Sequence, residues 1–482
     1  MSENTKSNTL KGLFWNTIDR FGNQAMVILV SVIIARIADP SAFAQYSVLL
    51  IFSTIATTFV NSGLATSLVR SKEVDQLDYS TMFCFNLTVS ISLYLILFFA
   101  APYMEQFYGI KGLALFARVL FLQIVIQSFG IVQNVKILRN FQFNLMMRSN
   151  VLAVFLSGGL TILMTYFGAP IWAMILQPVY YATFQTLFMW IWGDWKIDFT
   201  FSANSLKKHL HFSVSFMLSN LLGKALSQLY YNFNAKHFTE TVAGYYYNGN
   251  KWGETPGMLM SSIVQGTTLS TLAPIQDQSA RFLNACRKTM SSLVFVLFPV
   301  NMLAICVGEP AFRYFLTEKW MPSVVPFQWL CFVGIFIAMT DLNVNFLNIK
   351  GKSKFSLILE IIKFGASIIT YFLTYKHGIM MIIYGQLVIR VICYIIASAM
   401  SGKVYGYLIL NQLKDIIPSL LISVFAAGIA YLPLYYHWVD HDLLLLIIQT
   451  SIFAVLYIGI NHVLKNETWL EILGLVKKKI TK

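Results

Sequence analysis

Long apolar stretches with almost no charge follow one another from about Phe14 to His462. A helix needs about 20 residues to cross roughly 30 Å of hydrocarbon, so an apolar run of at least about 18 residues is a candidate membrane span. The sequence contains about fourteen such runs. Charged residues make up only 12% of the chain, whereas about a quarter of a soluble domain is charged. We therefore expect a polytopic membrane protein.

The spans are expected to be helices. Strands of a membrane barrel show alternating apolar and polar residues over about ten positions, whereas 27–37 and 91–101 show no such alternation. The sequence thus predicts an all-α fold. Its predicted spans are 14–37, 44–68, 80–102, 113–133, 149–168, 170–192, 212–233, 243–273, 290–308, 324–346, 356–375, 378–400, 416–436 and 443–464.

The basic residues of the loops indicate how the chain is inserted. Of the 35 lysines and arginines, 23 lie on one side of the predicted spans, five lie within spans and seven lie on the other side. Because cytoplasmic loops carry the excess of Lys and Arg, both termini are expected in the cytoplasm. Topology therefore explains the net charge of +14, and no nucleic-acid partner is expected.

An internal repeat relates the first twelve spans. At a shift of 200 residues, Ala35-Arg36 aligns with Ala235-Lys236, and Tyr46 aligns with Tyr246. Six spans return the chain to its starting side, so the halves are expected to be parallel repeats about an axis normal to the membrane. The predicted parts are an N-terminal six-helix lobe (1–192), a cytoplasmic linker (193–211), a C-terminal six-helix lobe (212–402), and two extra spans with a basic tail (403–482).

The chemistry is expected among the few charges inside the spans, because a charge at mid-bilayer costs about 2.5 to 3.5 kcal/mol on insertion scales. Some of them belong to polar stripes at helical spacing. Three stripes with a cation in the middle predict a cationic cavity in which Lys224 and Arg390 bind an anion. The stripes are Asn16, Arg20 and Asn23; Asn220, Lys224, Ser227 and Tyr231; and Gln386, Arg390 and Tyr394.

Several of these charges also have a simpler structural explanation. Arg20 adjoins Asp19 near the end of its span, so a local ion pair or a side chain that extends to the membrane surface is the alternative. Lys363 follows Glu360 by one helical turn, which favours an internal ion pair. Arg118 lies about one turn into its span, from which its side chain could extend outward.

Other positions leave two interpretations open. Lys251 lies in the polar segment 245–254, which is either a loop or the outer part of a long eighth span, and Glu254 is its alternative structural partner. Asp341 lies near the inner end of its span. It belongs either to a hydrated helix end or to a proton or cation site. Asp19, Asp341 and Glu360 are the candidates for ion coupling.

Enzymatic chemistry is not indicated. No Walker motif, glycine-rich phosphate loop or Ser/His/Asp motif is recognised, and the loops are too short for a nucleotide-binding domain. Neither a cofactor nor a metal site is expected, since the few histidines lie mainly at predicted membrane surfaces. The five cysteines are expected to be free thiols that pack as small apolar residues.

Short stretches along most of the chain resemble the polysaccharide transporters, or O-antigen flippases, of the multidrug/oligosaccharidyl-lipid/polysaccharide (MOP) exporter superfamily. They are 10–15 (LKGLFW), 35–46 (ARIADPSAFAQY), 243–246 (AGYY), 316–320 (LTEKW) and 348–353 (NIKGKS). The resemblance implies two six-helix lobes and a central cavity that opens alternately to the two sides of the bacterial cytoplasmic membrane.

The resemblance also implies a cargo, an undecaprenyl-diphosphate-linked glycan moved from the inner to the outer leaflet. Arg20, Lys224 and Arg390 are then expected to contact the diphosphate, since fixed cations must replace its water. Further lining candidates are Arg118, Lys251, Asn23 and Tyr231. Membrane lipids, a polysaccharide polymerase and glycosyltransferases are the implied partners. Three alternatives stay open: a lipid II-type flippase, suggested by the two extra spans, a multidrug exporter of the same fold, and a membrane scaffold for glycan-assembly enzymes.

Overall fold

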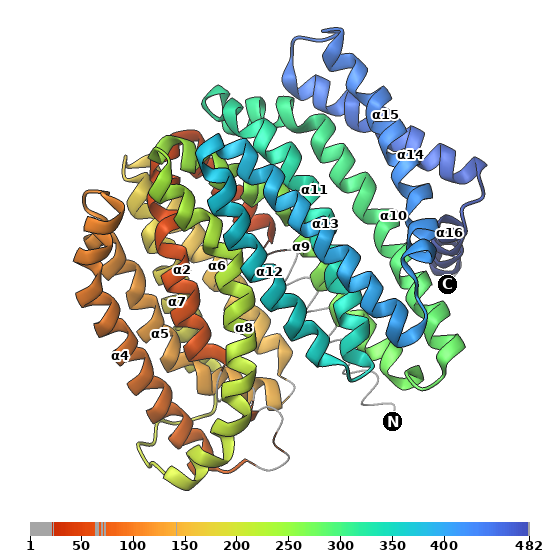
Figure 1. Ribbon diagram of the computed structural model, residues 1–482. Coiled ribbons are helices and arrows are strands. Elements are labelled where there is room, and N and C mark those ends of the chain that lie inside the picture. The colour runs from red at the N-terminus through yellow and green to blue at the C-terminus, as the bar shows by residue number, and fades with distance from the viewer. Residues whose placement is uncertain are drawn as a thin grey trace. The chain divides into compact units, whose positions relative to one another are not determined.

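The computed structural model of the protein describes residues 22, 24–62, 67, 68, 71, 74–140 and 142–480. Within these ranges the side chains of 61, 62, 210–220, 222, 226, 227, 263–267, 269, 270, 353, 472 and 475–480 are not described. The described chain is almost entirely helical (Figure 1). Ten of its helices are long and apolar enough to cross a membrane.

Each predicted span from the second to the fourteenth matches one long helix, and the described part of the first is the helix Gln24–Ile37. The fold class, a polytopic all-α membrane protein, is therefore confirmed. The long helices are α2 (Pro40–Ser62), α4 (Gln76–Tyr108), α5 (Leu113–Arg139), α6 (Phe143–Tyr166), α7 (Pro170–Trp192), α8 (Ala203–His237), α9 (Glu240–Leu272), α10 (Ser279–Ala311), α11 (Val324–Ile349), α12 (Ser353–Thr374), α13 (Ile379–Tyr405), α14 (Ile409–Tyr435), α15 (Asp442–Val463) and α16 (Glu467–Ile480). Short helical turns occupy Ala273–Ile275, Phe312–Leu316, Glu318–Ser323 and Tyr375–His377.

Local sequence signals define both ends of α4. Asp75 caps α4 by accepting a 2.7 Å hydrogen bond from the backbone N–H of Asp78, and the side chain of Asp78 accepts from the backbone of Asp75 in return. The helix ends at Gly109, which adopts the left-handed conformation (φ 71°) that favours glycine. Such caps satisfy the backbone groups that a helix end leaves without an internal partner.

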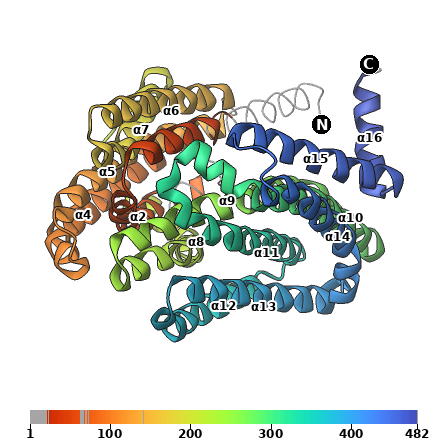
Figure 2. The same ribbon diagram turned by 90° about the horizontal axis from the view of Figure 1, so that it is seen from above.

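The chain divides into two compact units, Met1–Gly244 and Tyr245–Lys482. In the first unit, α5 packs between α4 and α7, α6 packs on α7, and α8 packs along α2 (Figure 1). In the second, α10 packs against α11, α14 and α15, while α13 packs against both α11 and α12 (Figure 2). The predicted lobes and linker, with their different boundaries, stay predictions.

The first unit includes α8 and the start of α9. Gln45 of α2 donates a 2.8 Å hydrogen bond to Glu240, and Tyr108 of α4 donates one of 2.8 Å to Asn232. The backbones of Pro40 and Gly244 lie so close that a Cβ on Gly244 would be 1.9 Å from the Pro40 carbonyl oxygen. The chain breaks between the helix Gln24–Ile37 and α2, and again 200 residues later between α8, which ends at His237, and α9, which begins at Glu240. The sequence repeat has the same shift.

The expectation for the cysteines is also confirmed. All five are free, and Cys286, Cys306, Cys331 and Cys393 are buried, whereas Cys84 is half-buried. Cys286 and Cys306 belong to one buried apolar cluster and Cys393 to another, as small apolar residues do.

Candidate functional site

In the second unit, α9 and α11 pack in parallel at very short distance. Gly249, Gly253 and Gly257 recur every four residues on α9 and therefore lie on one side of this helix. A Cβ on Gly257 would lie 2.2 Å from the carbonyl oxygen of Gly334 on α11, and one on Gly253 would lie 2.8 Å from Leu330 Cβ. Small residues allow such backbone contact between membrane helices. The close packing brings the polar side chains of both helices together.

Polar residues of α9 continue on this side of the helix. Asn250, Glu254 and Ser261 follow the spacing i, i+4 and i+11, which places them on one face. Ser261 donates a 2.7 Å hydrogen bond to Oδ2 of Asp341 on α11, and Glu254, only 8% exposed, accepts from Asn250. Asp341, which is half-buried, therefore takes part in the packed contact between two helices, and both interpretations of it stay predictions.

Arg390 of α13 adds a cation to these carboxylates. Its guanidinium is half-buried, and its positive charge acts on both Glu254 and Asp341. One turn earlier on α13, Gln386 donates a 2.6 Å hydrogen bond to the hydroxyl of Tyr246 on α9. The first two members of the stripe predicted from Gln386 to Tyr394 thus face α9.

Lys363 and Glu360 of α12 complete the cluster. Lys363 Nζ lies 2.5 Å from Glu360 Oε1, so the expected internal ion pair is present. Lys363 is 8% exposed, and both charges act on Asp341. The charged cluster of the second unit therefore comprises the carboxylates of Glu254, Asp341 and Glu360 and the cations of Lys363 and Arg390.

The cationic cavity that the three stripes predict stays a prediction, since two of its cations, Arg20 and Lys224, belong to the first unit and Arg20 lies outside the described residues. The spans contain more basic than acidic residues, but in the charged cluster three carboxylates accompany two cations. Sequence reasoning named Glu254 only as the alternative structural partner of Lys251, in a segment left open between a loop and a helix. The spacing of Asn250, Glu254 and Ser261 was the signal that could have identified it. An anion that binds Arg390 therefore also experiences the negative charge of these carboxylates.

Lys251 lies within α9, which is continuous from Glu240 to Leu272 and includes Pro256. The segment 245–254 is therefore helical and not a loop. The half-buried Lys251 has its Nζ 5.9 Å from the ring centroid of Trp252. Ten residues separate it from Ser261, which corresponds to roughly 15 Å along the helix axis. Lys251 thus lies at a different depth from Asp341.

The remaining candidates belong to the first unit. Arg118 lies 4.3 Å above the ring of Phe98 on the neighbouring α4 and donates a 3.4 Å hydrogen bond to its carbonyl, so a cation–π contact holds its guanidinium. On α8, Lys224 is exposed and Tyr231 is buried. Arg20, Asn23 and Asp19 lie outside the described residues.

A Ser/His/Asp cluster, for which the sequence shows no motif, lies elsewhere in the first unit. Ser67 Oγ is 2.8 Å from His209 Nδ1, and His209 Nε2 is 3.6 Å from Asp78 Oδ1. All three residues are less than 10% exposed, and Ser205 of α8 also donates to Asp78. Because a nucleophile needs access to its substrate, this buried cluster is best explained as a polar contact between the ends of α4 and α8.

The sequence has relatives among proteins of surface-polysaccharide synthesis. A family model described as polysaccharide biosynthesis protein matches residues 33–325. The lipopolysaccharide biosynthesis protein WzxC of Escherichia coli (strain K12) is 21% identical over 332 residues, 68% of this chain and 68% of that protein. An uncharacterized membrane protein in the cps region of Klebsiella pneumoniae is 20% identical over 437 residues, 89% of this chain and 88% of its own. The teichuronic acid biosynthesis protein TuaB of Bacillus subtilis (strain 168) is 18% identical over 303 residues, which cover 62% of this chain and 63% of that protein.

The fold is similar to that of solved membrane transporters. The lipid II flippase MurJ, in an inward closed conformation, superposes with a TM-score of 0.75 at 14% identity, covering 94% of this chain and all of the other. An inward-facing multidrug resistance MATE family transporter of the MOP superfamily gives a TM-score of 0.61 at 17% identity, covering 79% of this chain and 95% of the other. These similarities establish the fold.

Proposed function

Because the chain belongs to the polysaccharide biosynthesis protein family and has the fold of MOP superfamily transporters, we propose that it is a flippase for a polyprenyl-diphosphate-linked oligosaccharide. The supporting observation is the charged cluster of the second unit, in which Arg390 acts on Glu254 and Asp341. Charges inside a membrane are costly and mark the path of a polar substrate or an ion. A diphosphate-linked glycan is such a substrate.

The proposed recognition is the binding of the diphosphate by Arg390. The carboxylates of Glu254 and Asp341 act on its guanidinium through space and form no ion pair with it in the described chain. The diphosphate, with about two negative charges and several acceptor oxygens, binds the guanidinium through charge-assisted hydrogen bonds of the kind that arginine forms with phosphate. Because the nearby carboxylates repel the cargo, binding stays moderate and release is possible. Arg20, Arg118, Lys224 and Lys251 are further candidate contacts, with Asn23 and Tyr231 for the sugars.

The proposed direction is from the inner to the outer leaflet of the bacterial cytoplasmic membrane, by alternating access. Both termini are then cytoplasmic, in keeping with the 23 basic residues on that side of the spans. The prenyl tail can stay in the lipid, since only the polar head must cross. Asp341 and Glu360, together with Asp19, are the candidates for coupling transport to an ion. A polysaccharide polymerase and glycosyltransferases are the proposed partners.

The test reconstitutes the protein in vesicles with undecaprenyl-diphosphate-N-acetylglucosamine in one leaflet and measures how fast the sugar becomes accessible in the other. Arg390→Gln is expected to lower the rate at least about tenfold, the effect of losing a charge-assisted hydrogen bond. Arg390→Lys, which retains the charge, should keep part of the activity. The matched control is Arg281→Gln, which removes an exposed arginine bonded at 3.3 Å to Gln278 and should leave the rate unchanged. A wild-type rate in Arg390→Gln would refute the proposal.

A multidrug exporter of the same fold is the second candidate, and the carboxylates of the charged cluster favour it. Glu254 and Asp341 would then bind an organic cation. In that case wild-type vesicles transport ethidium and not the lipid-linked sugar, and Glu254→Gln abolishes ethidium transport. A lipid II-type flippase would instead prefer the peptide-bearing lipid in the same vesicles.

A further inference from the structure

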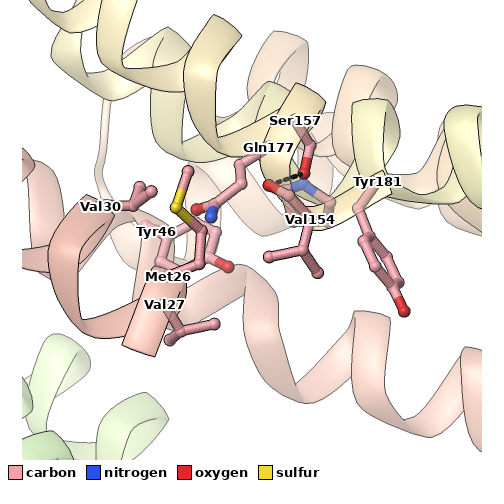
Figure 3. Close-up of a pocket in the computed structure, with 9 residues that line it drawn as sticks. Met26, Val27, Val30, Tyr46, Val154, Ser157, Gln177 and Tyr181 are labelled. Atoms are coloured by element: carbon pink, nitrogen blue, oxygen red, sulfur yellow. Dashed lines mark hydrogen bonds between the residues drawn. The ribbon is translucent and has the colours of Figure 1, made fainter. Parts of the chain in front are cut away.

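A cavity of about 330 Å³ lies inside the first unit, between the helix Gln24–Ile37, α2, α6 and α7 (Figure 3). Its volume is at the lower end of the roughly 300 to 1,000 Å³ typical of ligand pockets. Close packing defines one wall, because a Cβ on Gly158 of α6 would lie 2.6 Å from Met26 Cε. Val27 keeps 39% of its surface exposed, so the cavity has an accessible rim. The size suits one small ligand unit.

The lining combines apolar surface with neutral polar groups, and none of its residues is charged. Val27, Val30 and Val154 contribute aliphatic surface, and Tyr46 contributes an aromatic ring with a hydroxyl. In Figure 3 the carboxamide of Gln177 points toward Met26 and Tyr46. This carboxamide forms no hydrogen bond to another residue of the described chain, so its donors and acceptor are available to a ligand.

Other polar groups lie farther along the cavity. The hydroxyl of Ser157 donates a 3.2 Å hydrogen bond to the carbonyl of Val154 and can still accept one through its oxygen lone pairs. Tyr181 also lines the cavity, and its side chain lies on the other side of Val154 from Gln177 (Figure 3). Polar groups therefore flank the aliphatic surface of Val154.

We propose that this cavity binds one neutral sugar unit of the cargo, an inference that rests on the proposed flippase function. Sugars present both hydroxyl groups and aliphatic C–H faces, which match the amide, hydroxyl and apolar groups of the lining. A phosphate would lack a cation there. A prenyl chain would leave the carboxamide of Gln177 without a partner in a desolvated site, which is unfavourable. The chemistry therefore selects the uncharged polar part of a lipid-linked glycan.

The experiment compares the full-length protein in nanodiscs for binding of three lipids: undecaprenyl diphosphate and its conjugates with N-acetylglucosamine and with glucose. The wild type should bind at least one sugar-bearing lipid about tenfold more tightly than the bare diphosphate, the effect of one to two well-made hydrogen bonds. Gln177→Leu, which keeps the side-chain size, should remove this advantage while the affinity for undecaprenyl diphosphate stays unchanged. Val154→Leu, which narrows the cavity, should do the same.

Val455→Leu is the matched control, because Val455 is 71% exposed on α15 and lines no part of the cavity. It should leave all three affinities unchanged. The sugar site is overturned if the wild type binds the three lipids equally, or if Gln177→Leu and Val154→Leu weaken all three alike. Failure of the wild type to bind undecaprenyl diphosphate would contradict the proposed function instead, so the two failures are distinguishable.

Discussion

Gln412 of α14 is the centre of a buried hydrogen-bond network that joins α14 to α11 and α13. Its carboxamide oxygen accepts from Asn343 Nδ2 at 3.1 Å and from the hydroxyl of Tyr394 at 2.9 Å. Its nitrogen donates to Asn343 Oδ1 at 3.0 Å and to the carbonyl of Tyr407 at 3.2 Å. Both Gln412 and Asn343 are 0% exposed. Gln412→Met keeps the length of the side chain and removes all four hydrogen bonds.

The expected loss in the free energy of unfolding follows from this count. A hydrogen bond between membrane helices contributes on average about 0.6 kcal/mol, and up to 1 to 2 kcal/mol in favourable cases. Asn343 still donates a 3.1 Å hydrogen bond to the Met339 carbonyl and accepts one of 2.9 Å from Ser401, so it is not left without partners. We therefore expect Gln412→Met to cost about 2 to 3 kcal/mol, or roughly a 30- to 150-fold change in the folding equilibrium.

The assay is reversible unfolding by SDS in mixed micelles, with Gln449→Met as the control. Gln449 of α15 is also 0% exposed, but neither of its amide atoms has a hydrogen-bond partner within the described chain. The same substitution there removes a buried polar group that is not satisfied and is expected to be neutral or stabilising. A cost below about 0.5 kcal/mol for Gln412→Met, or equal losses for both variants, would refute the reasoning.

Two further changes test close packing and pH dependence. Gly244→Ala should lower the free energy of unfolding by about 1 to 3 kcal/mol, since its Cβ would lie 1.9 Å from the Pro40 oxygen. The control is Gly428→Ala, whose Cβ would have no atom within 4 Å and which should not lower the melting temperature. Burial lowers the pKa of His209, before predicted span 212–233, despite the opposing charge of Asp78. The unfolded chain therefore takes up a proton below about pH 6.5 that the folded chain does not, and stability should fall there. His209→Gln should flatten this decline in thermal unfolding from pH 8 to 5.5, and an unchanged profile would contradict the assignment.

The span positions were predictable because the membrane constrains each segment separately. Backbone groups in hydrocarbon must be satisfied within the segment itself, so a run of apolar residues identifies a helix without knowledge of its neighbours. The run at 170–192 matches α7 at both ends. Other helix ends differ from the prediction. For example, α10 begins at Ser279, where the sequence predicts 290, because a polar segment continues the helix beyond the apolar run.

The family resemblance was also accessible from the sequence, and the matching family model and relatives confirm it. Short stretches near helix ends carried it, such as 35–46, which spans the break between the first two helices. The lining of the cavity in the first unit was not predictable in this way. Met26, Gln177 and Tyr46 come from three helices, and no periodicity within one helix indicates which faces will meet.

Arg390 illustrates the division between sequence and structure. The sequence alone determined that the chain spans a membrane as helices and that a few charges, Arg390 among them, lie within those spans. At helical spacing Arg390 has no acidic neighbour, which predicted an unpaired cation. Only the tertiary structure supplied Glu254 and Asp341 from α9 and α11. Spacing along one helix determines which residues share a face, whereas the charge that a residue experiences depends on every helix packed around it.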